Sequence, residues 1–234
     1  MNFAVLLAGG IGSRMKTSKL PKQFLELGGE PVLRLTVDKF LVCPRIDHVI
    51  VAAPAIWMSH TKDLLRGERF SGVHVCEGGR TRQESLYNAV KYIETQFPVS
   101  PNDIVVSHDV ARPFVSLRVI EENIDAMEYF DAVDTVLPAT DTIVESDDQR
   151  TIARIQDRTR MYQGQTPQTF RRTTYLELYE KLDAAYLERV TDAARILAEH
   201  DCTVGLVHGD EFNIKITTEY DFRIAQFLLE GRHD

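Results

Sequence analysis

Cysteine is scarce in this chain, and long apolar runs are missing from it. The 234 residues include three cysteines, widely separated and without a Cys-x-x-Cys spacing. This pattern disfavours structural zinc and a disulfide framework, and it predicts buried free thiols in a reducing compartment. No apolar run approaches the length of a membrane span, and no basic segment precedes the apolar run near the N-terminus. We therefore expect a cytoplasmic protein with no membrane partner.

An excess of positive charge is also missing. The chain has 27 Lys and Arg against 35 Asp and Glu, a net charge of −8. That balance disfavours non-specific binding to nucleic acid or to anionic lipid, so no nucleic-acid partner is expected. It also makes each local group of basic residues more informative.

The familiar nucleotide-binding motifs are absent, yet a glycine-rich segment follows the first apolar run. After residues 4–7 the sequence continues as Ala8-Gly9-Gly10-Ile11-Gly12-Ser13-Arg14 and then Pro21-Lys22-Gln23. It lacks both the Gly-Lys-Ser/Thr ending of a Walker loop and the third glycine of the dinucleotide fingerprint. Glycines let backbone N–H groups approach a ligand closely, and Arg14 and Lys22 add fixed positive charge. An ordinary strand-to-helix turn is the alternative, and the two cations favour a phosphate site.

Short β-rich runs alternate with helical patterns over the first 130 residues. Strands are predicted near residues 4–7, 48–53, 73–76 and 103–107, and helices over 31–42, 56–66, 81–94 and 115–129. This order predicts an α/β fold: a single Rossmann-like domain, residues 1–234, with a mostly parallel sheet and helices on both faces. Ligands of such sheets bind at the carboxyl ends of the strands.

A different pattern follows residue 131. Strands at 132–137, 141–145 and 151–155 surround the polar turn 146–150, which predicts a projecting β-arm over approximately residues 132–165. Helices are then expected at 171–182, 189–199 and 218–229, with one strand at 202–207.

Two polar segments stand at predicted strand ends. Gly78-Gly79-Arg80-Thr81-Arg82 leads into a helix whose first turn includes Ser85, so it suits either phosphate or base binding or a simple capped helix start. The other is Ser107-His108-Asp109-Val110-Ala111-Arg112. Its aspartate suits Mg²⁺ held between a carboxylate and phosphate oxygens, and a buried Asp–Arg pair is the alternative. Arg112 suits either phosphate or a carboxylate, and we expect His108 to orient a neighbouring group.

Three later segments also carry polar residues that the packing of a hydrophobic core does not explain. Residues 163–168 place amides and Thr166 around a proline, whereas Thr191-Asp192 is equally well explained as a helix start. Lys215 lies within an apolar run, 213–217, which predicts a strand. A lysine there is costly unless it meets an anion, so Lys215 is a candidate site residue.

Six motifs in order now resemble one family. They are Ala8-Gly9-Gly10-x-Gly12-x-Arg14-Met15 with Pro21-Lys22-Gln23, Gly78-Gly79-x-x-Arg82-x-x-Ser85, His108-Asp109-x-Ala111-Arg112-Pro113, Thr166-Pro167-Gln168, Thr191-Asp192 and Asn213-Ile214-Lys215-x-Thr217. The series resembles the polyol-phosphate cytidylyltransferases, which have a ribitol 5-phosphate branch and a 2-C-methyl-D-erythritol 4-phosphate branch.

The resemblance implies that CTP and a polyol phosphate give a CDP-alcohol and pyrophosphate, with Mg²⁺ as cofactor and Asp109 as its ligand. It implies catalytic roles for Arg14, Lys22 and Lys215. The nucleotide-binding positions that it implies are Leu7, Ala8, Gly9, Gly10, Gly12, Gly79, Arg80, Arg82, Ser85 and Asp109. The acceptor-binding positions are Ala111, Arg112, Thr142, Arg158, Thr166 and Thr191. Arg158 reaches across a homodimer formed through the β-arm in the family.

The segment Tyr162-Gln163-Gly164-Gln165-Thr166, the Ala8-Gly9-Gly10 loop and Val133-Asp134-Thr135 resemble the ribitol branch, so CDP-ribitol is the expected product. Methylerythritol phosphate is the alternative acceptor. Phe212 replaces an aspartate found in many members, which weakens the case for a second metal carboxylate. A nucleotide-binding module without turnover and a sugar 1-phosphate nucleotidyltransferase using another base are the remaining alternatives.

Overall fold

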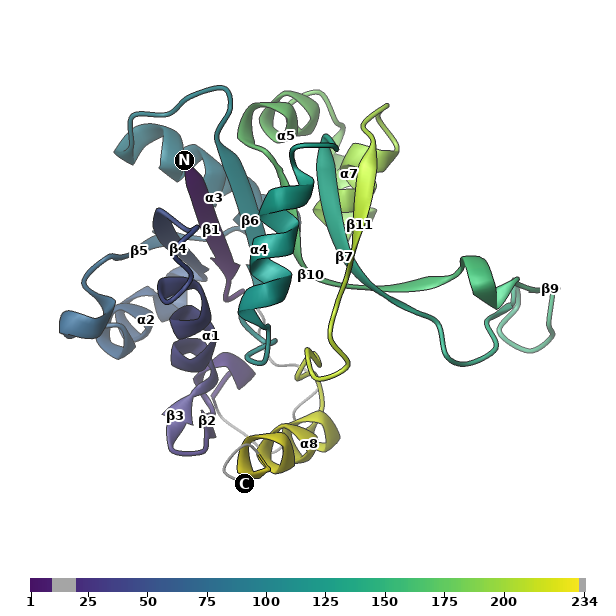
Figure 1. The fold of residues 1–234 in the computed structure, drawn as a ribbon, viewed down its shortest axis with the longest axis horizontal. Helices are drawn as coiled ribbons and strands as arrows, with labels where there is room; N and C mark the ends of the chain where they lie inside the picture. Colours follow the sequence, from purple (N-terminus) through teal and green to yellow (C-terminus); the bar gives the residue numbers. More distant parts are fainter. Residues whose placement is uncertain (10–19, 232–234) are drawn as a thin grey trace.

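A seven-stranded sheet in the order β11-β7-β10-β6-β1-β4-β5 forms the centre of the molecule (Figure 1). The computed structural model describes residues 1–9 and 20–231. Neighbours run parallel among β1 (Asn2–Leu7), β4 (His48–Ala53), β5 (Val73–Glu77) and β6 (Ile104–Asp109), and between β7 (Ala132–Pro138) and β11 (Val204–His208). β10 (Tyr162–Arg171) is antiparallel to both β6 and β7. The expected α/β fold with a mostly parallel sheet is confirmed.

Strand β1 is buried because both faces of the sheet are covered. Ala4 and Leu6 face one hydrophobic core, and Phe3, Val5 and Leu7 face the other. Side chains alternate along a strand, so a strand covered on both sides must be apolar throughout. This explains why the run from Phe3 to Leu7 has no polar residue.

The helices divide between the two cores. The first core includes residues of α1 (Val32–Leu41) and α4 (Leu117–Ala126), with Leu64 of α2 (Met58–Leu64) packed against it. The second includes residues of α3 (Arg82–Gln96), α5 (Arg172–Tyr179) and α7 (Ala193–Ala198), with α6 (Ala184–Arg189) beside it. A third, smaller core joins α8 (Glu219–Glu230) to β2 (Glu26–Leu27) and α1. The remaining short elements are β3 (Glu30–Pro31) and the 3-10 turns η1 (Lys22–Phe24), η2 (Ala55–Trp57), η3 (Glu68–Phe70) and η4 (Arg158–Arg160).

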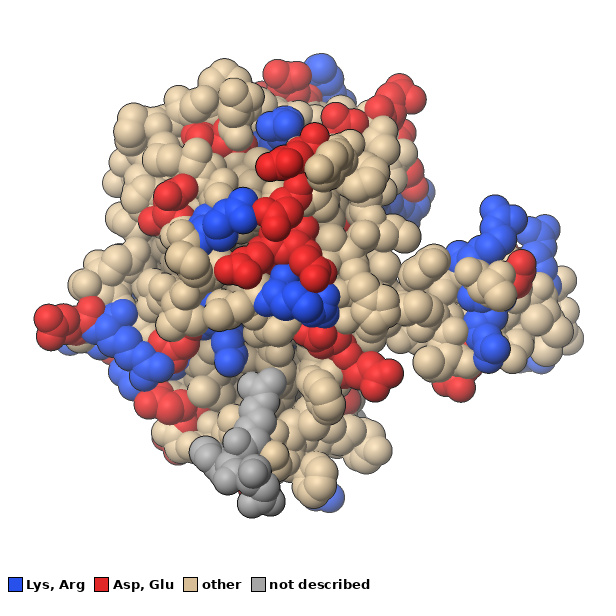
Figure 2. Space-filling view, in the orientation of Figure 1, with Lys and Arg blue, Asp and Glu red and all other residues tan. Residues whose placement is uncertain are grey.

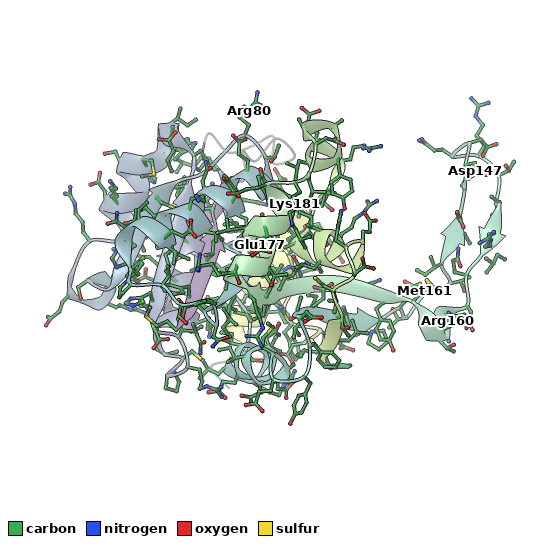
Figure 3. All side chains as sticks on the ribbon, turned by 90° about the horizontal axis from the view of Figure 1, so that it is seen from above. Arg80, Asp147, Arg160, Met161, Glu177 and Lys181 are labelled. Atoms are coloured by element: carbon green, nitrogen blue, oxygen red, sulfur yellow. The ribbon has the colours of Figure 1, made fainter. Side chains whose placement is uncertain are left out.

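Residues 138–162 form an arm that leaves the body beyond β7 and before β10 (Figure 1). Between β7 and β10 the arm has the short strands β8 (Val144–Glu145) and β9 (Arg154–Ile155), which pair with each other and are shorter than predicted. In Figure 3, Asp147 lies near the tip, and Arg160 and Met161 lie where the arm meets the body. Basic side chains gather on it in Figure 2, and its sequence supplies Arg150, Arg154, Arg158 and Arg160.

Three sequence predictions were wrong in detail. Strand β10 was not predicted, because its glutamines and threonines interrupt any apolar alternation. The predicted helix 189–199 begins only at Ala193, where the Asp192 side chain accepts a hydrogen bond from the Arg195 amide at 2.9 Å and caps α7. Residues 213–217 form no strand. Within residues 1–9 and 20–231, no helix is long and apolar enough to cross a membrane.

The position of Phe170 yields a stability prediction. Phe170 is fully buried on β10, and its ring centroid lies 4.8 Å from that of Tyr175. We expect Phe170→Ala to lower the free energy of unfolding by about 3–5 kcal/mol, measured by urea denaturation, because the ring leaves a cavity. Phe227→Ala is the control, since Phe227 is 74% exposed. A loss for Phe170→Ala no larger than that of the control would contradict this account of the core.

Candidate active site

The carboxyl ends of β1, β5 and β6 meet at one edge of the sheet. β1 ends at Leu7, opposite Asp109 at the end of β6, and β5 ends just before Gly78. A cavity of about 370 Å³ opens there. Its lining residues are Leu7, Gly9, Lys22, Gly79, Arg80, Thr81, Arg82, Ser85, Asp109, Ala111, Lys215 and Thr217.

Asp109 is the charged centre of this cavity. Its Oδ2 lies 2.7 Å from Lys215 Nζ, and its Oδ1 lies 3.1 Å from Arg82 Nε. Burial alone would raise the pKa of this carboxyl, but the charges of Arg82 and Lys215 together hold its pKa well below the ordinary value. Asp109 is therefore ionised at neutral pH. Its ion pairs connect α3 and the segment after β11 to the end of β6.

The Gly78-Gly79 turn is shaped by close packing against α3. Ser85 Oγ accepts from the Gly79 amide at 2.9 Å and donates to the Thr81 carbonyl at 2.8 Å. A β-carbon on Gly79 would lie 2.2 Å from Glu84 Cγ, so a side chain there would displace Glu84. Thr81 caps α3 by accepting from the Glu84 amide at 3.0 Å. The turn therefore holds the positive N-terminal end of a 15-residue helix at the cavity, which favours anions.

A second cavity of about 380 Å³ adjoins the first and shares Arg82, Asp109 and Lys215 with it. The rest of its lining comes from Arg112, Asp134, Gly164, Gln165, Thr166, Gln168, Thr191 and Asp192. The two cavities therefore meet at the Asp109 cluster of Asp109, Arg82 and Lys215.

Two buried guanidinium nitrogens of residues that line the cavities have no hydrogen-bond partner among the described residues, Arg82 Nη1 and Arg112 Nε. Arg112 Nη1 donates to the Asn213 carbonyl at 2.8 Å, which fixes the guanidinium in place. Burial lowers the pKa of Arg112, and the nearby charge of Asp109 counters that effect. Buried unpaired donors are costly. Arg82 Nη1 and Arg112 Nε therefore indicate an anionic ligand that would accept hydrogen bonds from them.

His108 lies beneath the second cavity and lines neither cavity. The Arg112 carbonyl can only accept, so His108 Nε2 donates to it at 3.0 Å. In the neutral ring Nδ1 is then an acceptor, and the Thr166 hydroxyl, which itself accepts from the Asp109 amide at 3.2 Å, donates to it at 3.0 Å. Burial lowers the pKa of His108 to about 4, so the ring is neutral at pH 7. In the structure His108 orients Thr166 and Arg112, the kind of role predicted for it.

The structure brings most of the predicted site residues together. Leu7, Gly9, Lys22, Gly79, Arg80, Arg82, Ser85, Asp109, Ala111 and Lys215 line the first cavity, and Arg112, Thr166 and Thr191 line the second. Arg80 projects outward from the body (Figure 3). Ala8 is buried and its carbonyl accepts from Gln23 Nε2 at 2.7 Å. Gly10, Gly12 and Arg14 lie outside the described residues.

The two arm residues do not join this group. Thr142 and Arg158 are exposed and line neither cavity, and Arg158 Nη1 donates to the Thr140 carbonyl at 2.7 Å. Arg112 is not the ion-pair partner of Asp109 that the alternative interpretation required. Arg82 and Lys215 hold that role instead.

Sequence reasoning included Gln168 in the polar segment 163–168 but assigned no site role to Asp134 or Thr217, and all three line the cavities. Asp134 had a detectable signal, because it is the charged residue in a strand that is otherwise mostly buried and apolar. The chemistry of the first cavity also suits a metal ion carried with phosphate. In the described part of the chain no cluster of three or more His, Cys, Asp or Glu could hold a metal alone. Asp109 is the acidic residue of the first cavity, and Mg²⁺ needs only one or two carboxylates when phosphate oxygens complete its shell.

Comparison with known proteins identifies the family of this chain. The family model for 2-C-methyl-D-erythritol 4-phosphate cytidylyltransferase matches residues 2–231. The structure of 4-diphosphocytidyl-2C-methyl-D-erythritol synthase from Anaerococcus prevotii is 30% identical, with a TM-score of 0.82, covering 98% of this chain and 96% of that one. The 2-C-methyl-D-erythritol 4-phosphate cytidylyltransferase of Francisella tularensis is 28% identical, with a TM-score of 0.80 and coverage of 97% and 98%.

The corresponding enzyme of Thermus thermophilus is 28% identical, with a TM-score of 0.73, covering 98% of this chain and 100% of that one. The resemblance found in the motifs is thereby confirmed. The chain belongs to the 2-C-methyl-D-erythritol 4-phosphate cytidylyltransferase family, and it is a nucleotidyltransferase that uses CTP.

Proposed function

We propose that this enzyme transfers the cytidylyl group of CTP to 2-C-methyl-D-erythritol 4-phosphate and releases pyrophosphate. The observation that carries the proposal is the meeting of two cavities at the Asp109 cluster, in a chain whose family match spans residues 2–231. One cavity suits a nucleotide triphosphate and the other a second phosphate compound, so the cluster lies where the two phosphates would react. The acceptor is taken from the names of the matching family and relatives.

The nucleotide occupies the first cavity in this proposal. The α3 N-terminus, Gly79 and Ser85 bind the nucleoside end, while Lys22, together with Arg14 from outside the described residues, binds the triphosphate. A phosphate oxygen of the acceptor forms a bond to the α-phosphorus as the bond from that phosphorus to pyrophosphate breaks. The attacking oxygen is already anionic, so no general base is needed, which agrees with the absence of His108 from both cavities.

Lys215 and Arg82 stabilise the charge of the reacting phosphates. Both are held by Asp109 before any substrate binds, so little reorganisation is needed when negative charge develops. Mg²⁺, carried with the triphosphate at Asp109, would supply further charge neutralisation. The acceptor binds in the second cavity against Arg112, Thr166 and Thr191, with Ala111 of the first cavity beside its phosphate.

Ribitol 5-phosphate is the second candidate acceptor, and it was the expectation from the sequence. The observation that favours it is the polar wall of the second cavity, where Asp134, Gln165 and Gln168 offer more hydrogen-bonding groups than one phosphate requires. The family match does not support ribitol over methylerythritol phosphate.

An acceptor panel decides between the two. Pyrophosphate release should require CTP, Mg²⁺ and an acceptor together, and 2-C-methyl-D-erythritol 4-phosphate should give the highest kcat/KM. A higher value with ribitol 5-phosphate in the same assay would replace the first acceptor by the second. Turnover with UTP and a sugar 1-phosphate, or tight CTP binding with no turnover, would overturn both.

Lys215 yields a prediction about catalysis. We expect Lys215→Ala to lower kcat by about a hundredfold, because removing one charge-stabilising group typically costs about 3 kcal/mol in the transition state. Lys181→Ala is the matched control, since Lys181 is exposed in the turn after α5 and lines neither cavity (Figure 3). Near-normal kcat in the Lys215 variant, with an unchanged unfolding curve, would remove Lys215 from the mechanism.

The arm yields a prediction about assembly. We propose that a homodimer forms through the arm, so that Arg158 and Thr142 contact the acceptor in the partner's site. Three apolar side chains on the arm, Val144, Ile152 and Ile155, are 51%, 61% and 62% exposed, and a partner would cover them. Arg158→Ala should raise the acceptor KM while leaving the CTP KM unchanged.

Mixed dimers test whether Arg158 acts across the interface. At an acceptor concentration far below the raised KM of Arg158→Ala, the Arg158→Ala and Lys215→Ala variants are each slow alone, and mixing their subunits should restore about a quarter of wild-type activity. Half of randomly paired two-fold dimers are mixed, and each contains one intact site. No recovery on mixing, or a monomer by sedimentation at assay concentration, would show that Arg158 does not act in this way.

A further inference from the structure

Asp134 on β7 lines the second cavity and is held in one position by Gln168. The two residues are opposite each other in the β7–β10 register, and Gln168 Nε2 donates to Asp134 Oδ1 at 3.0 Å. The other end of the same amide, Gln168 Oε1, accepts from the Ala193 amide at 3.1 Å. With both ends engaged, the Gln168 amide has one orientation, and the carboxylate of Asp134 is fixed with it.

Position 164 places no side chain over the second carboxylate oxygen of Asp134. A β-carbon there would lie 3.8 Å from Asp134 Oδ2, and the residue is glycine. Asp192 lines the same cavity from the start of α7, where its Oδ1 is engaged by the Arg195 amide and its Oδ2 accepts from Thr191 Oγ1 at 3.2 Å.

Charge is unevenly distributed along this cavity. Arg82, Arg112 and Lys215 line it together with Asp109, whereas Asp134 and Asp192 are the carboxylates outside the Asp109 cluster. A phosphate is attracted to the cations and repelled by the two other carboxylates. A hydroxyl group, in contrast, donates a strong hydrogen bond to a carboxylate. The pattern is complementary to a molecule with a phosphate at one end and hydroxyls on the remaining chain.

We propose that Asp134 is a specificity residue that accepts hydrogen bonds from the hydroxyls of the acceptor, and that Gln168 is the positioning residue that aims it. The inference rests on the proposed function, because it concerns the acceptor of that reaction. It holds for either polyol phosphate, since both carry hydroxyls on the chain beyond the phosphate. Phosphates with an apolar chain would offer no hydrogen-bond donor to this half-buried carboxylate beyond the one that Gln168 supplies, and would be rejected.

The protonation state of Asp134 adds a second readout. Burial raises the pKa of Asp134 to about 6, the charge of Asp192 adds to that, and Gln168, Arg82 and the Thr135 amide oppose it. Lys215, Arg112 and Asp109 line the same cavity. As the pH falls from 7 to 5, the carboxylate is lost and with it one hydrogen-bond acceptor. The acceptor's own phosphate also titrates near pH 6, and comparison with an Asp134 variant separates the two effects.

The test compares two substrates in three variants. The substrates are the preferred polyol phosphate and an alkyl phosphate of the same chain length, and the variants are Asp134→Leu, Asp134→Asn and the control Glu128→Gln. Glu128 is exposed and lines neither cavity. We expect Asp134→Leu to reduce the kcat/KM ratio of polyol phosphate to alkyl phosphate by about 10- to 100-fold, the value of a hydrogen bond to a charged group. The CTP KM should stay within about twofold, because Asp134 is outside the first cavity.

Asp134→Asn keeps the size of the side chain and covers the case in which the leucine variant does not fold. It should raise the acceptor KM. It should also remove the part of the fall in kcat/KM between pH 7 and pH 5 that comes from protonation of Asp134 in the wild type. Glu128→Gln should match the wild type in both measurements.

The possible failures can be told apart. An unchanged substrate ratio and an unchanged pH profile in the Asp134 variants, in an enzyme that turns over polyol phosphates, would overturn this inference alone. If the wild type shows no turnover, calorimetric titration of the polyol phosphate into the enzyme with CTP replaces kinetics. Equal binding by the wild type and Asp134→Asn would then overturn the inference, and no binding to the wild type would overturn the proposed function with it.

Discussion

The ion pairs of Asp109 with Arg82 and Lys215 hold the site together. Arg82 starts α3, Asp109 ends β6, and Lys215 lies in the segment between β11 and α8, so three distant parts of the chain meet at one carboxylate. Without that carboxylate the two cations, with Arg112 beside them, would repel one another in a partly buried space. Asp109 therefore makes the cationic cluster stable in the absence of phosphate, while leaving more positive than negative charge there to attract it.

The reversed strand β10 decides where the second cavity lies. An all-parallel sheet would have continued from β6 to β7 directly, with a helical crossover on one face. Instead β10 runs between them and places Thr166 and Gln168 at the same sheet edge as Asp109. Thr166 is tied to the end of β6 through the Asp109 amide and His108. The arm is the other consequence, because β7 and β10 are joined through residues 138–162.

The sequence predicts the parts of this structure whose physical cause is local. The β-branched, largely apolar run 48–53, bounded by Pro54, favours a buried strand, and the glycines at 78 and 79 favour a turn. Strand β10 was missed because it carries polar residues that line the site, and these residues break the apolar alternation that predicts a strand. Lys215 was correctly expected to meet an anion, although the run around it forms no strand. The sequence alone does not show which anion Lys215 meets or that Arg82 rather than Arg112 pairs with Asp109. Both depend on contacts between residues far apart in sequence.

In the proposed reaction, this layout separates the chemistry from the choice of acceptor. Asp109, Arg82 and Lys215 line both cavities, so a change at any of them would act on the reacting phosphates of that reaction. Asp134 touches only the second cavity and is linked to the body through a neutral amide, Gln168, and the backbone of α7. A substitution at position 134 therefore changes the groups offered to the acceptor without adding or removing a charge at the reacting phosphorus. On this argument, relatives that use different polyol phosphates are expected to differ on β7 and β10 while keeping the ends of β1 and β6.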